Sequence, residues 1–156
     1  MRSIYTILVL VALLVSCIGN QPKDNSQITK IVQEHLKDKS ISFDEDVRNC
    51  VIIPGGGCSG CIASGISFVN SHKENFGKMQ KRNIVVFTNI FSLKKLRKQL
   101  DVMSFDELNC IVDTSNMYLM HCDENIYPIV LMLDKSKLKD VKVQSPQEEG
   151  LYEINL

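Results

Sequence analysis

The stretch VRNCVIIPGGGCSGCIASGISFV, residues 47–69, decides the fold. Its first part, Val47–Ile53, is a short and largely apolar run, which predicts a buried strand. Pro54 and three glycines end that strand. Apolar residues at helical spacing then predict a helix from Cys61 to about Phe76. The stretch therefore predicts a strand, a glycine-rich turn and a helix, with two cysteines at the junction.

The rest of the chain alternates strands and helices in the same way. The segment ITKIVQEHLKD, from residue 28, has the spacing of an amphipathic helix. Further apolar runs predict strands at Ile84–Thr88, Cys110–Asp113 and Ile129–Leu133, an edge strand at Val141–Val143, and a helix carrying Leu93 to Leu100 with Ser92 as its N-cap. Because strands that alternate with helices form a sheet covered on both faces, we expect an α/β fold with a central mixed sheet of about four strands.

The N-terminus, MRSIYTILVLVALLVSC, resembles a bacterial lipoprotein signal. Arg2 gives a positive start, an apolar run reaches Val15, and the small residue Ser16 precedes Cys17. That run is much shorter than the roughly 20 apolar residues that span a hydrocarbon core, which disfavours a permanent membrane helix. We expect cleavage after Ser16 and a diacylglyceryl group on Cys17, which would anchor the chain to a membrane of the bacterial cell envelope.

The predicted organisation is a signal peptide at 1–16, a flexible tether at 17–26 and a single domain at 27–156. Cleavage of 16 of the 156 residues leaves 140, which is enough for one domain with one core. Without Arg2, 17 basic residues stand against 18 acidic residues, so we expect no attraction to nucleic acid. The basic stretch KKLRK, residues 94–98, fits the solvent face of its helix.

The cysteines point to thiol chemistry at the junction of strand and helix. Besides Cys17 the chain has five: Cys50, Cys58, Cys61, Cys110 and Cys122. An exported chain meets a compartment where disulfides persist, and an odd count leaves at least one thiol unpaired in a monomer. Cys58-Ser59-Gly60-Cys61 begins a helix, where unsatisfied N–H groups and the helix dipole stabilise a thiolate. A lowered pKa would make Cys58 a nucleophile, and Cys61 could attack the mixed disulfide that forms.

These features resemble the thioredoxin-like family, in particular the membrane-tethered thiol–disulfide reductases of the bacterial envelope. CSGC follows a buried strand, Pro128 precedes IVLML, and IVLMLDKSKLKDVKV (129–143) is similar to the family's strand, acidic turn and returning strand. The resemblance covers about Val47 to Val143. It implies that the Tyr127–Pro128 peptide bond is cis and holds the substrate backbone beside the disulfide. A trans proline at a strand entry is the alternative.

The departures from the family pattern concern proton handling and redox direction. Gly57 stands where the family usually has an aromatic residue, and Ile52 where many members have a buried carboxylate. The dipeptide Ser59-Gly60 lacks the histidine that helps oxidising members to stabilise their thiolate. The resemblance therefore favours a reductase or isomerase over a strong oxidant. It implies cysteine-containing proteins as substrates, an upstream electron donor and no cofactor.

Two other functions stay open on the residues alone. Zinc sites also use the C-x-x-C spacing, and Cys110, His121 and Cys122 are candidates for further ligands; His121 and Cys122 with nearby methionines would also suit copper. In the second alternative the chain is an interaction module in which CSGC is a static disulfide. Without a metal, Cys110 and Cys122 are expected to form a structural disulfide or to stay buried as thiols. His35 and His72 have no partner at a suggestive spacing, and we expect both at the surface.

Overall fold

The computed structural model describes residues 25–120, 122–154 and 156. Five strands form one mixed sheet in the order β3-β2-β1-β4-β5. The strands are β1 (Asn49–Pro54), β2 (Asn83–Thr88), β3 (Cys110–Asp113), β4 (Ile129–Asp134) and β5 (Lys137–Val143). The helices are α2 (Asn25–Asp38), α3 (Ser59–Ser71) and α4 (Leu93–Gln99), with short 3-10 helices at Lys73–Phe76, Phe105–Glu107, Asp123–Ile126 and Gly150–Glu153. The α/β class is confirmed, with five strands where the sequence predicted about four.

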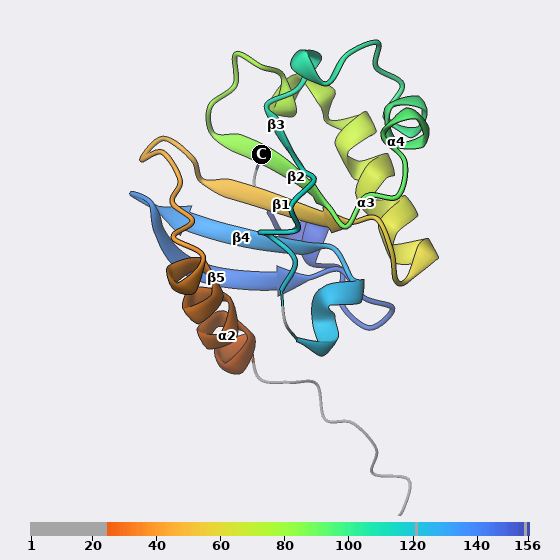
Figure 1. Ribbon diagram of the computed structural model, residues 1–156. Coiled ribbons are helices and arrows are strands. Elements are labelled where there is room, and N and C mark those ends of the chain that lie inside the picture. Colours follow the sequence, from red (N-terminus) through yellow and green to blue (C-terminus); the bar gives the residue numbers. More distant parts are fainter. Residues whose placement is uncertain (1–24, 121, 155) are drawn as a thin grey trace, which may run out of the picture.

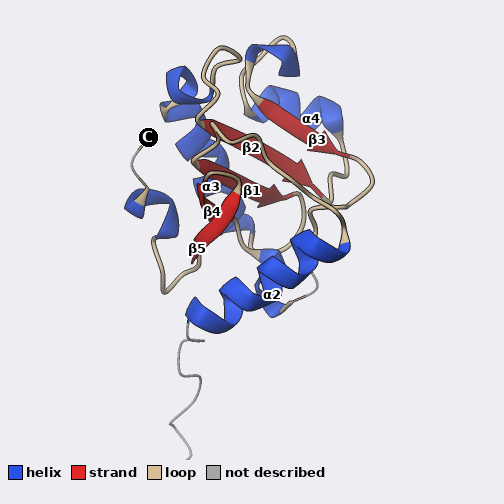
Figure 2. Ribbon diagram, turned by 90° about the vertical axis from the view of Figure 1, so that its left-hand side faces the viewer, coloured by secondary structure: helices blue, strands red, loops and turns tan. Residues whose placement is uncertain are grey.

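The helices cover both faces of the sheet. β1, β2 and β3 run parallel, and β4 and β5 are each antiparallel to their neighbours. α3 joins β1 to β2 and α4 joins β2 to β3, so right-handed crossovers that step in one direction place both helices on the same face. α2 covers the other face. Figure 1 shows the sheet between α2 and the α3–α4 pair, and Figure 2 shows the same separation from another side.

Each face of the sheet has its own apolar cluster. In β1, Val51 and Ile53 belong to the cluster under α3 and α4, whereas Cys50 and Ile52 belong to the cluster under α2. This alternation follows from the two-residue period of a strand. Because both faces are covered, β1 and β2 are buried on both sides, which is why their sequences are continuously apolar.

Several element boundaries differ from the predicted ones. α2 begins at Asn25, so the last two residues of the predicted tether belong to the helix. α3 ends before His72, and a 3-10 helix continues to Phe76 where one long helix was predicted. β5 begins at Lys137 rather than Val141, because two residues of positive φ make the turn after β4. The predicted N-cap Ser92 is confirmed by its side chain, which accepts a hydrogen bond from the Lys95 N–H.

The prediction that both histidines lie at the surface is wrong for His35. The imidazole is 8% exposed, and its Nε2 lies 2.8 Å from the carbonyl oxygen of Met117. A buried polar group needs such a partner, and here the contact joins α2 to the connection between β3 and β4. His72 is half-buried and packs on the ring of Phe68, with ring centroids 4.5 Å apart.

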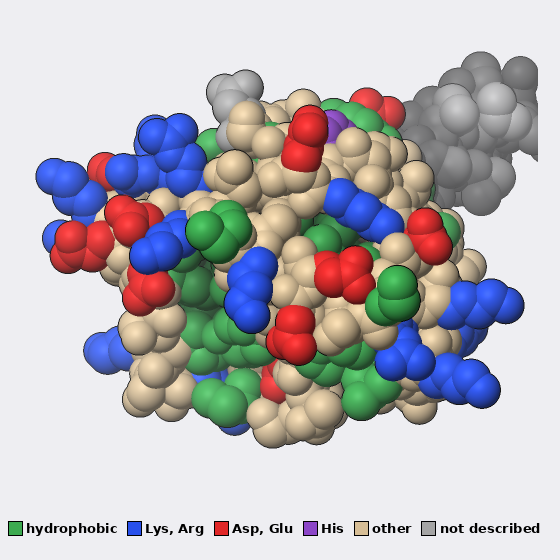
Figure 3. Space-filling model, turned by 90° about the horizontal axis from the view of Figure 1, so that it is seen from above, with side chains coloured by type: hydrophobic (Ala, Val, Ile, Leu, Met, Phe, Trp, Pro, Cys, Tyr) green, Lys and Arg blue, Asp and Glu red, His purple; other side chains and the backbone are tan. Residues whose placement is uncertain are grey.

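The surface carries charges of both signs. On the face shown in Figure 3, Lys and Arg side chains lie among Asp and Glu side chains, with hydrophobic side chains between them. This matches the equal numbers of basic and acidic residues in the whole chain. Of the helices that the structure describes, none is both long enough and apolar enough to cross a lipid bilayer.

Candidate active site

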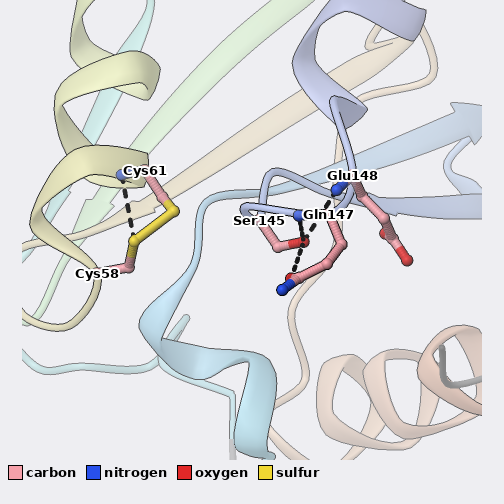
Figure 4. The surroundings of a disulfide bond; sticks show 5 residues. All are labelled: Cys58, Cys61, Ser145, Gln147 and Glu148. Carbon is pink, nitrogen blue, oxygen red and sulfur yellow. Dashed lines mark hydrogen bonds between the residues drawn. A yellow bond between two sulfur atoms is a disulfide. The ribbon is translucent and has the colours of Figure 1, made fainter. Parts of the chain in front are cut away.

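The CSGC motif lies at the edge of the sheet where β1, β2 and β3 end and β4 begins. The segment Gly55–Gly57 connects β1 to α3, Cys58 is the N-cap residue of α3, and Cys61 lies in the first turn. Cys58 and Cys61 form a disulfide, with their Cα atoms 5.3 Å apart (Figure 4). The junction of strand, glycine turn and helix that the sequence predicts is therefore confirmed.

The two sulfur atoms of the pair have different surroundings. Cys58 is half-buried, whereas Cys61 is only 7% exposed. The backbone N–H of Cys61 donates to the Sγ of Cys58 over 3.3 Å, so the sulfur takes the place that a Ser or Asp oxygen has at an ordinary N-cap. Cys58 thus presents the outer sulfur, next to the start of a helix, and Cys61 the inner one.

Gly57 fixes the approach of the chain to Cys58. Its φ is +127°, and a Cβ at this position would lie 2.5 Å from the carbonyl oxygen of Ile126. The same carbonyl accepts a hydrogen bond of 3.0 Å from the Cys58 N–H. Gly60 differs, because a Cβ there would meet nothing within 4 Å. Of Gly57 and Gly60, only Gly57 has a backbone conformation and surroundings that require glycine.

Pro128 lies on the disulfide side of the molecule, but its peptide bond with Tyr127 is trans, so the prediction of a cis bond is wrong. Tyr127 is extended, with φ −111° and ψ 151°, which is the conformation that a residue before a trans proline prefers. The chain therefore enters β4 without reversing, and the Pro128 carbonyl accepts a hydrogen bond of 2.8 Å from the Gln144 N–H. The buried proline ring packs on α3, since a Cβ on Gly65 would lie 3.2 Å from its Cγ.

Two of the three cysteines outside the motif, Cys50 and Cys110, are poor nucleophiles. Burial raises the pKa of the Cys50 thiol far above its ordinary value. Burial and, secondly, the negative charge of Asp106 raise the pKa of Cys110 to about 11. Cys110 is a free thiol, so the alternative of a disulfide between Cys110 and Cys122 is not realised. Cys122 lines a small cavity together with Ile28 of α2 and Tyr127, the residue before Pro128.

The residues proposed for a metal site do not come together in the part of the chain that the structure describes. There, no group of three His, Cys, Asp or Glu side chains has the arrangement that could hold a metal ion. His121 lies outside the described residues, as does Cys17. Met120 is 2% exposed in the apolar cluster under α2, as expected of a core methionine.

The buried carboxylate of Asp113 supports the loop after β3, and its role was not predicted from the sequence. Asp113 accepts hydrogen bonds of 2.8 Å from the Thr88 hydroxyl and from the Tyr118 N–H. It also accepts from the Ser115 hydroxyl and the Met117 N–H. Burial alone raises the pKa of the Asp113 carboxyl, but these four hydrogen bonds outweigh it and bring the pKa below its ordinary value.

Two further segments at the end of the sheet that carries the disulfide left no recognisable signal in the sequence. Ile126 acts through its backbone carbonyl, and only its place two residues before Pro128 could have indicated it. The Ser145–Glu148 turn follows β5, and its N–H groups at Gln147 and Glu148 donate to the Ser145 hydroxyl. In Figure 4 the segment leading into β4 runs between this turn and the disulfide.

The chain matches no protein-family model, no curated protein and no solved structure in the three comparisons made. No family is assigned on that basis, and the thioredoxin-like resemblance stays an expectation from the sequence. Support for a function comes from the residues and contacts of the site.

Proposed function

We propose that the chain is a thiol–disulfide oxidoreductase of the bacterial envelope, acting on cysteine-containing proteins through Cys58 and Cys61. One observation carries this proposal. A cysteine pair lies at the first turn of α3, in which the outer residue, Cys58, is half-buried and its sulfur faces a backbone N–H. In the reduced protein, the same N–H and the helix dipole would favour the Cys58 thiolate.

In the reductase direction, the Cys58 thiolate attacks one sulfur of a substrate disulfide. The substrate S–S bond breaks, a mixed disulfide forms with Cys58, and the other substrate sulfur leaves as a thiolate that takes up a proton. Cys61 then loses its proton and attacks the Cys58 sulfur, which releases the second substrate thiol and forms the Cys58–Cys61 disulfide. Two electrons and two protons pass to the substrate, and an external dithiol donor returns them to the protein.

The strip of chain from Ile126 to Pro128 supports a role in presenting the substrate. Its Ile126 carbonyl is bound to the Cys58 N–H, and Pro128 is packed on α3. Within the proposal, Tyr127 and Pro128 position the substrate backbone beside the outer sulfur, with their peptide bond in the trans form. Gly57 keeps this strip in contact with the motif.

The proposal includes a lipid anchor at Cys17, which rests on the lipobox-like sequence before it. Incorporation of labelled palmitate into the chain, and its loss in Cys17→Ala, would test the anchor by itself. Failure of this test would remove the envelope location and leave the thiol chemistry untouched.

The thiol chemistry is tested by trapping. Cys61→Ala should accumulate mixed disulfides with cysteine-containing proteins, because the resolving thiol is missing, and Cys58→Ala should accumulate none. Cys110→Ala is a matched control that should leave trapping in the Cys61→Ala background unchanged. A chain that purifies with stoichiometric zinc or copper would instead support the metal-binding alternative. Absence of trapping together with a reduction potential below roughly −300 mV would identify a static disulfide.

A further inference from the structure

A groove of about 230 Å³ lies next to the motif, between α3 and α4. Its lining includes Gly57 and Ser59, the residues on either side of Cys58, and Ala63 one turn further along α3. The opposite wall includes Phe91, from the loop after β2, and Lys95 of α4. The groove thus begins one residue away from the outer sulfur.

Contacts between two loops fix the shape of the groove. The Gly55 N–H donates to the Thr88 carbonyl over 2.8 Å, and a Cβ on Gly55 would collide with the carbonyl of Asn89. A Cβ on Gly56 would lie 3.0 Å from the ring of Phe91. That ring is nevertheless 81% exposed, so a large aromatic side chain at the wall remains available to another molecule.

The rim of the groove on the α4 side is positively charged. The helix has the sequence LKKLRKQ, with four basic residues and no acidic residue, and all four are exposed. Lys95 is the charged residue of the groove lining. In the part of the chain that the structure describes, the ion pairs join other residues. The groove therefore combines a floor of buried apolar residues, including Ile53, Ile66 and Phe87, with a positive rim that no ion pair neutralises within the described part of the chain.

The size of the groove suits side chains rather than a cofactor. Pockets for cofactors and other small molecules are usually about 300–1,000 Å³, whereas an apolar cavity of about 150 Å³ already accepts benzene. We propose that this groove binds the polypeptide substrate of Cys58, with an apolar side chain of the substrate in the groove and an acidic residue beside it facing Lys95. The inference rests on the proposed function and names its preferred substrate class.

The test measures how fast the reduced full-length chain reduces short peptides. Each peptide carries one cysteine as a mixed disulfide with glutathione. A first variable position near that cysteine is Phe or Ser, and a second variable position next to it is Asp, Ser or Lys. Every rate is divided by the rate of the same protein with glutathione disulfide, which needs no groove. At low salt we expect Phe to be preferred over Ser by about tenfold, and Asp over the neutral residue by about two- to fivefold. The preference for Asp should fade at about 1 M salt.

Variants assign these preferences to the groove. Lys95→Gln should abolish the preference for Asp, whereas Lys94→Gln, on the same helix but outside the groove, should keep it. Ala63→Phe should fill the groove and reduce the preference for Phe to about twofold or less. If that variant does not fold, Phe91→Ala, at an exposed side chain, should reduce the same preference.

Equal rates for all peptides, or equal effects of Lys94→Gln and Lys95→Gln, would overturn the groove proposal. If the protein still reacts with glutathione disulfide in that case, the proposed function is retained. Binding of α4 to phosphatidylglycerol vesicles that blocks peptide reduction would also overturn it, because the groove would then face a membrane. No reaction with glutathione disulfide would instead count against the proposed function itself.

Discussion

Replacing Gly57 by alanine should destabilise the protein far more than replacing Gly60. At Gly57 the φ of +127° lies where residues with a side chain are strained, at a cost of about 1–3 kcal/mol. The new methyl group would also lie 2.5 Å from the Ile126 carbonyl oxygen and 2.6 Å from its Cα, and such overpacking costs about 1–3 kcal/mol. Part of this is relieved if the loop moves, so we expect Gly57→Ala to lower the free energy of unfolding by about 2–5 kcal/mol.

Gly60 is the matched control, because it lies only three residues further along the chain. A Cβ there meets nothing within 4 Å, and the residue is exposed in the first turn of α3. Alanine is the better helix former, so Gly60→Ala should be neutral or stabilising by up to about 1 kcal/mol. The two variants should therefore differ by about 2–6 kcal/mol in stability.

Urea unfolding of the oxidised protein, followed by circular dichroism, measures this difference as a shift of the midpoint at constant m-value. Gly57→Ala should also alter the rate of reaction with glutathione disulfide, because moving Ile126 breaks its hydrogen bond to Cys58. Equal stabilities of the two variants, within about 0.5 kcal/mol, would refute the close approach of Ile126 to Gly57.

Three further predictions concern half-buried or buried polar groups. The rate of Cys110 alkylation, followed by mass spectrometry, should be low at pH 8 and rise toward pH 11. Because the pKa of Cys110 is raised in the folded protein, the free energy of unfolding should also decline as the pH rises from 9.0 toward 11. Cys110→Ala should flatten this decline. Asp113→Asn should cost about 2–3 kcal/mol in urea unfolding. Since the pKa of Asp113 is lowered, that stability is present above pH 3.8 and lost as the pH falls below it. If the stability of the wild type and of Asp113→Asn fell equally at acid pH, this prediction would be contradicted. His35→Ala should cost about 1–3 kcal/mol by leaving the Met117 carbonyl unsatisfied, and an unchanged midpoint would show that water replaces the imidazole.

The elements that the sequence predicts best are those whose signal is local and whose burial is complete. β1 and β2 are covered on both faces, so their continuous apolar runs identify them within a residue or two. The CSGC motif is similarly local, because proline and glycines separate a strand from a helix whose N-cap residue is Cys58. The position of Pro128 beside this motif follows from the order of the strands.

Features that depend on contacts between distant segments could not be predicted in the same way. The Tyr127–Pro128 isomer is set by how the chain enters β4, and proline itself permits both forms. Ile126 takes part through a backbone carbonyl, which every residue has. The apolar floor beneath Lys95 forms only when the ends of β1 and β2 meet, so the sequence indicated an ordinary solvent-facing helix there. His35 was misplaced because its partner, Met117, lies on another element.

The start of α2 and the end of the sheet that carries the disulfide lie on the same side of the molecule, since Ile28 and Tyr127 line one small cavity. From Cys17 to Asp24 the chain has eight residues, which extend over at most about 28 Å. A lipid on Cys17 would therefore anchor the domain through a short tether and keep the disulfide near the bilayer. Encounters would then occur by lateral diffusion within the membrane plane, so the protein would meet membrane-bound partners more often than proteins moving freely in bulk solution.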